Sequence, residues 1–340
     1  MCPLTFAIVL IVLLLASPSA WCFSRLCLPI THQRVFSTAR CSSTRQDAAT
    51  TTTTSTGSSS PPRPQQQGED RLHRLQGKLL KEMRKICKDY QMIQEGDHVM
   101  ICVSGGKDSA TLLSLFLLLQ KRLPVNFEIT AVHVDQKQPG YNGTSLVQWL
   151  DSDLDVKYKI VEEDTYSIVL DKTDPGKSFC AVCSRLRRGI LYTTALELGC
   201  NKIALGHHAD DALETLLLNM VYGGQMKAMP ARYQSKRGSL AVMRPLIASR
   251  EDDIAEYAAL MDFPILPCNL CSNQADLQRP TIKMLLKTLQ SMNPTAGQNM
   301  LRACQDVRPS HLLDQSLRKA CGMDPITGEV VDDEDAQLNA

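Results

Sequence analysis

The amino-acid sequence predicts an α/β domain whose parallel sheet is doubly wound, with helices on both faces. Apolar runs of strand length alternate with helical segments through the middle of the chain, the order that produces parallel sheets. A glycine-rich turn follows the first of these strands and a pair of acids follows a later one. Both motifs therefore fall at the carboxyl ends of strands, where open parallel sheets bind their ligands.

The elements of this domain can be followed in order from Arg71. Apolar residues recur at helical spacing among lysines and arginines from Leu72 to Ile86, which predicts an amphipathic basic helix. Short apolar runs predict buried strands at 99–103, 129–134, 156–161 and 202–205. Longer segments predict the connecting helices at 111–120, 186–198 and 212–220.

The first 70 residues have the composition of a disordered leader. Residues 4–16 form an apolar run that suits a signal peptide and is short for a membrane span of about 20 residues, although no Lys or Arg precedes it. Residues 21–46 hold four arginines, many hydroxyl side chains and no acid, which is typical of a transit peptide. Residues 50–68 are mostly Thr, Ser, Pro and Gln, a composition that cannot offset chain entropy by burial, so we expect a disordered linker.

These features divide the leader into a signal-peptide-like segment, 1–22, and a transit-peptide-like segment with the linker, 23–70. The combination resembles the bipartite leader of proteins sent to plastids that are bounded by extra membranes. We therefore expect the mature protein in the plastid stroma, with a mitochondrion or another organelle as the alternative. Once the leader is removed, no stable membrane association is expected.

The cysteine pattern favours metal binding over disulfides. The chain has 13 cysteines, an odd number, in a sequence too long for a small disulfide scaffold. Two C-x-x-C pairs stand far apart, Cys180 with Cys183 and Cys268 with Cys271. Four thiolates could bind zinc, three could hold a [4Fe–4S] cluster with one iron left open, and one pair alone could be a redox motif. Spacing alone leaves these three readings open.

The glycine-rich turn is Ser104-Gly105-Gly106-Lys107-Asp108-Ser109. Two glycines allow the backbone to turn sharply and approach an anion. The helix that follows offers free N–H groups, to which Lys107 adds a formal charge and the serines add hydroxyl donors. The spacing is neither that of a Walker A loop nor G-x-G-x-x-G. The turn is therefore predicted to hold phosphate by a different arrangement.

The acid pair, Asp210 and Asp211, opens a predicted helix. An aspartate at this place commonly caps the helix, and the two roles are compatible. Carboxylates beside a triphosphate site also suit Mg²⁺, so Asp211 is predicted to bind magnesium or ATP. Zinc binding by His207 and His208 is disfavoured, because adjacent residues at a strand end point in different directions.

The turn SGGKDS resembles the signature of the PP-loop ATP pyrophosphatases, a superfamily that includes GMP synthetase and tRNA lysidine synthetase and has a Rossmann-like, adenine nucleotide α-hydrolase-like sheet. Further segments resemble the tRNA 2-thiocytidine biosynthesis family of the TtcA type. They are 134–140, 158–163, 178–192, 219–224, 267–271 and 309–312. The resemblance runs in order from about residue 72 to about residue 314. Ala209 and His133 depart from bacterial members, which often have Arg and Asn there. The change at Ala209 concerns the charge at one edge of the ATP or tRNA site.

This resemblance implies ATP-dependent formation of 2-thiocytidine at position 32 of the tRNA anticodon loop, the activity of a tRNA-cytidine(32) 2-sulfurtransferase. ATP would adenylate the C2 oxygen, and sulfur would be transferred through a [4Fe–4S] cluster. The implied cluster ligands are Cys180, Cys183 and one cysteine of 267–271, for which we choose Cys271 over Cys268. The implied catalytic residues are Lys107, Asp108, Cys180 and Cys183. ATP would be held by Ser104, Gly105, Gly106, Lys107, Asp108, Ser109 and Asp211, with Mg²⁺ on Asp108 or Asp211.

The implied partners are tRNA, a cysteine desulfurase as sulfur donor and a second copy of the chain. Arg185, Arg187 and Arg188, with Lys202 and the basic helix, could bind tRNA phosphates or could form a solvated basic face. The implied division of the chain is basic helix 71–98, PP-loop ATP-binding domain 99–260, C-terminal segment with the cluster ligand 261–315, and acidic tail 316–340. A PP-loop enzyme that makes 2-thiouridine and a zinc-stabilised RNA-binding module are the alternatives.

Overall fold

The computed structural model describes residues 64–173, 179–235, 240–266 and 278–330. The leader segments predicted within 1–63, the second C-x-x-C pair and the last ten residues of the acidic tail lie outside these ranges. Within them, no helix combines the length and apolar character needed to cross a membrane.

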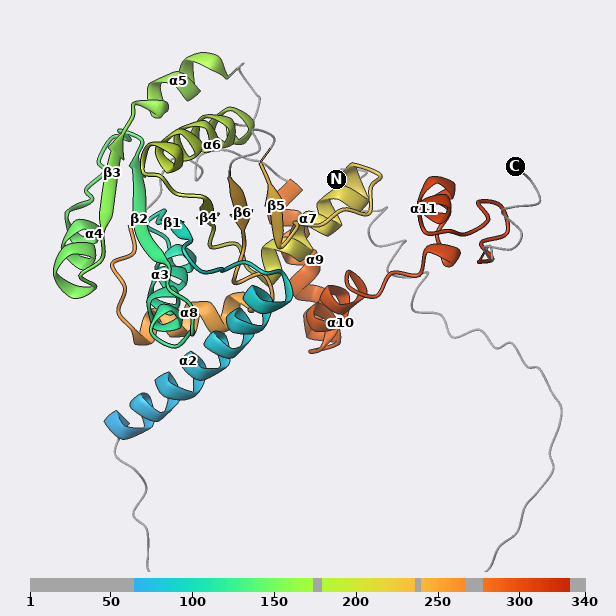
Figure 1. Ribbon diagram of the computed structural model, residues 1–340, viewed down its shortest axis with the longest axis horizontal. Coiled ribbons are helices and arrows are strands. Elements are labelled where there is room, and N and C mark those ends of the chain that lie inside the picture. Colours follow the sequence, from blue (N-terminus) through green and yellow to red (C-terminus); the bar gives the residue numbers. More distant parts are fainter. Residues whose placement is uncertain (1–63, 174–178, 236–239, 267–277, 331–340) are drawn as a thin grey trace, which may run out of the picture. The chain divides into compact units, whose positions relative to one another are not determined.

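The centre of the domain is a six-stranded sheet in the order β3-β2-β1-β4-β6-β5 (Figure 1). Five strands are parallel, and β5 at the edge runs antiparallel to β6. The strands are β1 His98–Cys102, β2 Glu128–Asp135, β3 Tyr158–Glu162, β4 Lys202–Ala204, β5 Arg232–Gln234 and β6 Ala241–Met243. The predicted doubly wound α/β fold and its four strands are confirmed. The sequence pattern did not predict β5 and β6, which have three residues each.

Helices cover both faces of the sheet. The main ones are α2 Pro64–Asp89, α3 Lys107–Gln120, α5 Thr165–Lys172, α6 Cys180–Glu197, α7 Ala209–Tyr222, α8 Glu251–Leu260, α9 Gln278–Met292 and α10 Ala296–Ala303. Shorter turns of helix are α4 Thr144–Gln148, the π-helical η1 Trp149–Asp153, the 3₁₀ turn η2 Pro309–His311 and α11 Gln315–Ala320.

Alternation along the strands divides the core into two layers. Val99 and Ile101 of β1 pack into the larger cluster with α2, α3 and α8, whereas Met100 packs into the second cluster with α6. The phosphate turn between β1 and α3 is thereby anchored on both sides, because its preceding strand is buried on both faces and Leu112, Leu113 and Phe116 of α3 are fully covered.

The amphipathic basic helix predicted from Leu72 is α2, and it packs on α8 and α3. Arg71 forms an ion pair with Glu256 and Lys78 one of 2.6 Å with Asp253, both acids on α8. Part of the positive charge of α2 is thus neutralised by the domain itself. Four other basic residues of α2 have no ion pair among the described residues, and all four are exposed: Arg74, Lys81, Arg84 and Lys88.

Candidate functional site

The phosphate turn is closed by its two serines. The backbone N–H of Ser104 donates to Oγ of Ser109 over 3.0 Å, and the two hydroxyls lie 3.0 Å apart. Gly105 has φ +82°, in the left-handed region that favours glycine, and its carbonyl accepts from the N–H of Leu266. The turn therefore leads directly into the start of α3, where free N–H groups and the helix dipole attract anions.

The predicted magnesium carboxylates approach the same histidine. Nε2 of His208 lies 3.8 Å from Oδ1 of Asp108 and 3.4 Å from Oδ2 of Asp211. A close backbone approach explains the proximity of these two motifs. A Cβ on Gly206 would lie 3.0 Å from the backbone of Asp108, so only glycine lets the β4 end come this near to α3.

The helix cap at α7 differs from the expectation. His208 is the N-cap residue, and its side chain and that of Asp211 form a reciprocal capping box. Asp210, for which capping was the alternative role, does not cap this helix; it is buried and accepts from the N–H of Glu251 over 2.7 Å. The acid contacts the start of α8, which only the tertiary structure brings near.

A network of charges that the sequence motifs did not reveal surrounds Lys107. Its ammonium lies 3.0 Å from Asp108 and 3.2 Å from Glu251 of α8, and Glu251 also lies 2.8 Å from Lys283 of α9. Burial opposes ionisation of Glu251, but the hydrogen bond from Lys283 and the charge of Lys107 lower its pKa to about 2. No short motif contains Glu251 or Lys283, because they come from α8 and α9, far from Lys107 in the chain.

A second ion pair of α9 reaches the acids of α7. Arg279 lies 3.3 Å from Glu214 and 3.8 Å from Asp211. The side chains of α9 therefore border the nucleotide end of the site, although the sequence reading had assigned this segment only to a cluster ligand.

The first C-x-x-C pair stands at the start of α6. Cys180 is the first residue of this helix, and Cys183 follows three residues later. The Cys183 side chain is buried in an apolar cluster, and its thiol donates to Oε1 of Gln136 over 3.4 Å. The members of that cluster are Val169, Tyr166, Phe179, Val182 and Leu186. Two cysteines at C-x-x-C spacing supply soft sulfur donors of the kind that metal centres and clusters bind.

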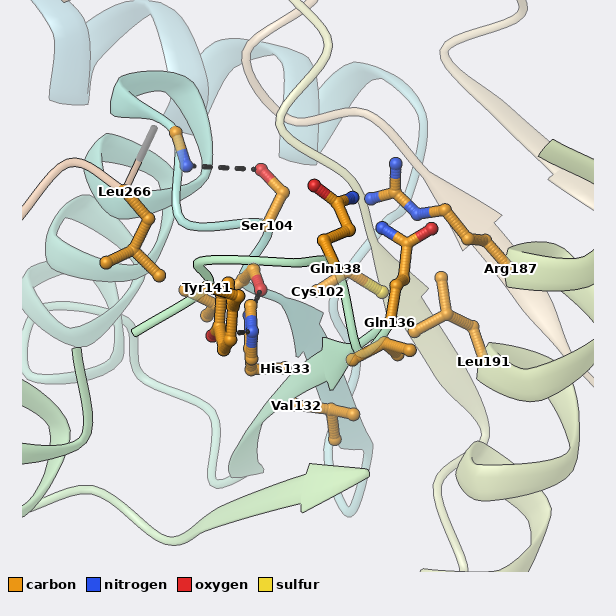
Figure 2. A pocket seen from close by; sticks show the side chains of 13 residues that line it. Cys102, Ser104, Val132, His133, Gln136, Gln138, Tyr141, Arg187, Leu191 and Leu266 are labelled. Carbon is orange, nitrogen blue, oxygen red and sulfur yellow. Dashed lines mark hydrogen bonds between the residues drawn. The ribbon is translucent and has the colours of Figure 1, made fainter. Parts of the chain in front are cut away.

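One cavity connects the phosphate turn to the neighbourhood of Cys183. It has a volume of about 220 Å³ and is lined by Cys102, Val103, Ser104, Gly106, Val132, His133, Val134, Gln136, Gln138, Tyr141, Arg187, Leu191 and Leu266 (Figure 2). Ser104 and Gly106 belong to the turn, whereas Gln136 contacts Cys183. Lys107 and Cys183 do not themselves line this cavity; Lys107 follows Gly106 in the chain, and Cys183 contacts Gln136.

One wall of the cavity is a stacked pair of rings. His133 and Tyr141 have parallel rings 5.7 Å apart, and the Tyr141 hydroxyl lies 2.5 Å from Nε2 of His133. Nδ1 of His133 lies 2.7 Å from the carbonyl oxygen of Val103. Burial lowers the pKa of His133, so a neutral ring that donates from Nδ1 and accepts at Nε2 satisfies both contacts.

The cations proposed for tRNA binding separate into three kinds. Arg185 and Arg188 of α6 are exposed, whereas Arg187 lines the cavity. Lys202 is buried and forms an ion pair of 2.5 Å with Asp97. The expectation that Lys202 contacts tRNA phosphates was wrong, because β4 carries this side chain into the interior.

Cys268 and Cys271, the two candidates for a third cluster ligand, lie outside the described residues. Asp108 of the phosphate turn and Asp211 both lie near His208, Ser104 and Gly106 of the turn line the cavity, and Cys183 contacts Gln136 of the same lining. Among the described residues, the site thus combines a nucleotide end and a sulfur end on one parallel sheet.

This fold and site define the protein as a PP-loop nucleotide-binding protein, and the family model described as the PP-loop domain matches residues 75–284. Curated relatives narrow the class. The chain is 51% identical over 258 residues to the tRNA-cytidine(32) 2-sulfurtransferase of Vibrio cholerae, covering 76% of this chain and 83% of the relative. It is 52% identical over 241 residues to the enzyme of the same name from Aliivibrio salmonicida, covering 71% and 78%. The chain belongs to the tRNA-cytidine(32) 2-sulfurtransferase family, as the motif resemblance predicted.

Solved structures show the same fold. The U34-tRNA thiolase NcsA from Methanococcus maripaludis, described with its [4Fe–4S] cluster, aligns with a TM-score of 0.54 at 22% sequence identity. The alignment covers 66% of this chain and 76% of that one. At this identity the likeness concerns the fold, which is the α/β architecture predicted from the alternation of strands and helices.

Proposed function

We propose that the protein thiolates C2 of cytidine 32 in the tRNA anticodon loop in an ATP-dependent reaction. The observation that carries the proposal is the continuous cavity from the phosphate turn to Gln136, the residue whose amide contacts Cys183. Replacement of a carbonyl oxygen by sulfur needs an activating nucleotide and a sulfur source at the same carbon. Membership of a family whose curated members carry this name supports the cytidine substrate.

The residues divide the work between two steps. In the first, O2 of cytosine bonds to the α-phosphorus of ATP, and pyrophosphate leaves with the electron pair of the broken P–O bond. The phosphate turn and Lys107 bind the charge of the pyrophosphate. In the second, sulfide as HS⁻ attacks C2, the C2–O2 bond breaks, and AMP leaves with the oxygen and the electron pair. The proton from HS⁻ ends on the pyrophosphate or in solvent, so atoms and charge balance.

Two further groups are proposed for the site. The carboxylate oxygens of Asp108 and Asp211, which both lie near Nε2 of His208 beside the phosphate turn, are hard donors of the kind that Mg²⁺ prefers. Cys180 and Cys183, with Cys271 as the third thiolate, are proposed to hold a [4Fe–4S] cluster. When bound, such a cluster supplies an iron with an open position for sulfur. The base must leave the anticodon-loop stack to enter the cavity, which costs a few kcal/mol.

The cellular setting is proposed from the sequence. The donor of sulfur is a cysteine desulfurase, the enzyme acts as a homodimer, and the leader directs it to the plastid stroma. These proposals are independent of the chemistry at the site and can fail without affecting it.

The test is anaerobic reconstitution with iron and sulfide, followed by reaction with ATP and tRNA transcript and by nucleoside analysis. Formation of 2-thiocytidine that requires ATP is expected, with loss of the product in Cys183→Ser. Formation of 2-thiouridine instead would favour a different tRNA base. A colourless protein that binds zinc and RNA but yields no thionucleoside would overturn the enzymatic function.

A further inference from the structure

The arginines that follow the C-x-x-C pair point in different directions from α6. At 100° per residue, Arg187 lies about one turn beyond Cys183 and on the same face, and Leu191 lies one turn further. Both Arg187 and Leu191 line the cavity. Arg185 and Arg188 are rotated from Cys183 by about 200° and 140°, so they face solvent, where both are exposed.

Arg187 has no carboxylate partner among the described residues. Three other cations near the phosphate turn are paired: Lys107 with Asp108 and Glu251, Lys283 with Glu251, and Arg279 with Glu214. In the described lining of the cavity, Arg187 alone carries a permanent charge. A half-buried cation without a counter-charge is costly unless a ligand supplies the anion.

The side chains around Arg187 suit an anionic ligand, because they are neutral and leave the arginine charge free to bind it. Figure 2 shows its guanidinium turned toward the side-chain amides of Gln136 and Gln138. Neutral amides accept or donate hydrogen bonds without cancelling the charge. The planar fork of an arginine matches two oxygens of a phosphate. The cavity therefore presents one phosphate-binding side chain beyond the phosphate turn.

We propose that Arg187 is a catalytic residue that binds the non-bridging oxygens of the α-phosphate, while Arg185 and Arg188 bind only the tRNA backbone. This inference rests on the proposed function. With pyrophosphate at the turn and the base beside Cys183, the α-phosphate is the group bonded to both, so it occupies the middle of the cavity. Arg187 lines this cavity together with Ser104 and Gly106 of the turn.

The assignment gives Arg187 a part in both chemical steps. As O2 of cytosine bonds to the α-phosphorus and pyrophosphate leaves, negative charge on the equatorial oxygens is stabilised by the guanidinium. When HS⁻ forms the C2–S bond and the C2–O2 bond breaks, the same group stabilises the departing AMP. A tRNA-backbone contact would instead act on binding alone.

The experiment compares Arg187→Gln and Arg187→Lys with Arg185→Gln and Arg188→Gln in the reconstituted enzyme. Circular dichroism and iron content establish the fold and loading of each variant. The rates of tRNA-dependent pyrophosphate release and of 2-thiocytidine formation are then measured with saturating ATP and tRNA, and the Kd for tRNA is measured at several salt concentrations.

Arg187→Gln is expected to lower kcat for both products by about 100-fold, the cost of removing one preorganised donor, with the Kd for tRNA within threefold of wild type. Arg187→Lys should recover at least tenfold of this loss, since it restores charge without the fork. Arg185→Gln and Arg188→Gln should instead raise the Kd for tRNA and reduce its salt dependence.

An unchanged kcat with a raised Kd for tRNA in Arg187→Gln would make this arginine a backbone contact and overturn the proposal. A lysine variant no better than the glutamine variant would assign it a packing role, with the same consequence. If wild-type enzyme forms no 2-thiocytidine, the proposed function fails. If wild-type enzyme forms 2-thiocytidine and Arg187→Gln forms it at the same rate, only the assignment of Arg187 fails.

Discussion

The thiol of Cys183 donates to the side-chain oxygen of Gln136 over 3.4 Å, and Gln136 lines the cavity that begins at Ser104 and Gly106. The two residues come from α6 and from the end of β2, 47 positions apart in the chain. This contact is the physical link between the cysteine pair and the nucleotide end of the site. It also makes the region around Cys183 sensitive to the charge carried at position 136.

Gln136→Glu is expected to weaken cluster incorporation by about 10-fold or more, which is typical of lost outer contacts at metal sites. A carboxylate beside a ligand thiolate repels it, whereas the native amide can turn its NH₂ toward the sulfur. Iron per chain after anaerobic reconstitution measures the effect. Gln138 also lines this cavity, so Gln138→Glu is the matched control. Equal iron contents in the two variants would contradict the expectation.

Gly105→Ala is expected to destabilise the protein more than Gly96→Ala. Both glycines have positive φ, +82° and +77°, which costs another residue about 1–2 kcal/mol. A Cβ at Gly105 would also lie 2.9 Å from Cδ1 of Leu266, whereas nothing lies within 4 Å of one at Gly96. Urea denaturation measures the difference between the two variants, and ATP binding should fall only in Gly105→Ala. Equal destabilisation of the two variants would show that the Leu266 side chain moves away from the new methyl group without loss of stability.

Glu251 predicts an acid-dependent component of stability. Its pKa in the folded protein is about 2, below the ordinary value of 4.5, because Lys283 and Lys107 favour the carboxylate against the effect of burial. The stabilisation is therefore complete above pH about 4.5 and is lost as pH falls toward about 2. Glu251→Gln should remove this component, a loss on the order of 2 kcal/mol at neutral pH after allowance for solvent screening.

Free energies of unfolding measured from pH 7 to pH 3 check this expectation. Asp252→Asn, at the exposed neighbouring acid, is the control and should follow wild type. A Glu251→Gln variant with the same pH profile as wild type would remove Glu251 from the account of acid stability.

Lys202→Met is expected to destabilise the fold by about 3–5 kcal/mol, because it leaves the buried carboxylate of Asp97 without its counter-charge. Affinity for tRNA should stay the same, since the side chain has no access to solvent. Thermal unfolding and tRNA titration measure the two quantities. Lys81→Met, an exposed base of α2, is the comparison and should show the opposite pattern. Weaker tRNA binding in a stable Lys202→Met would restore the first interpretation of this lysine.

The sequence by itself determined the parallel α/β fold, the phosphate turn and the family. These depend on local order: a strand of buried residues, the turn from Ser104 to Ser109, and a helix, repeated with different motifs along the chain. Short motifs such as the C-x-x-C pair carry their spacing in the sequence, so they can be recognised without a structure.

Only the tertiary structure decided which charges meet and which of them are buried. Glu251 reaches Lys107 from 144 positions away, Lys202 turns inward to Asp97, and Arg187 separates from its neighbours Arg185 and Arg188. These differences arise because ion pairing and burial depend on which elements pack together. On one helix, residues only one or two positions apart point in different directions, so one can line a cavity while its neighbour faces solvent.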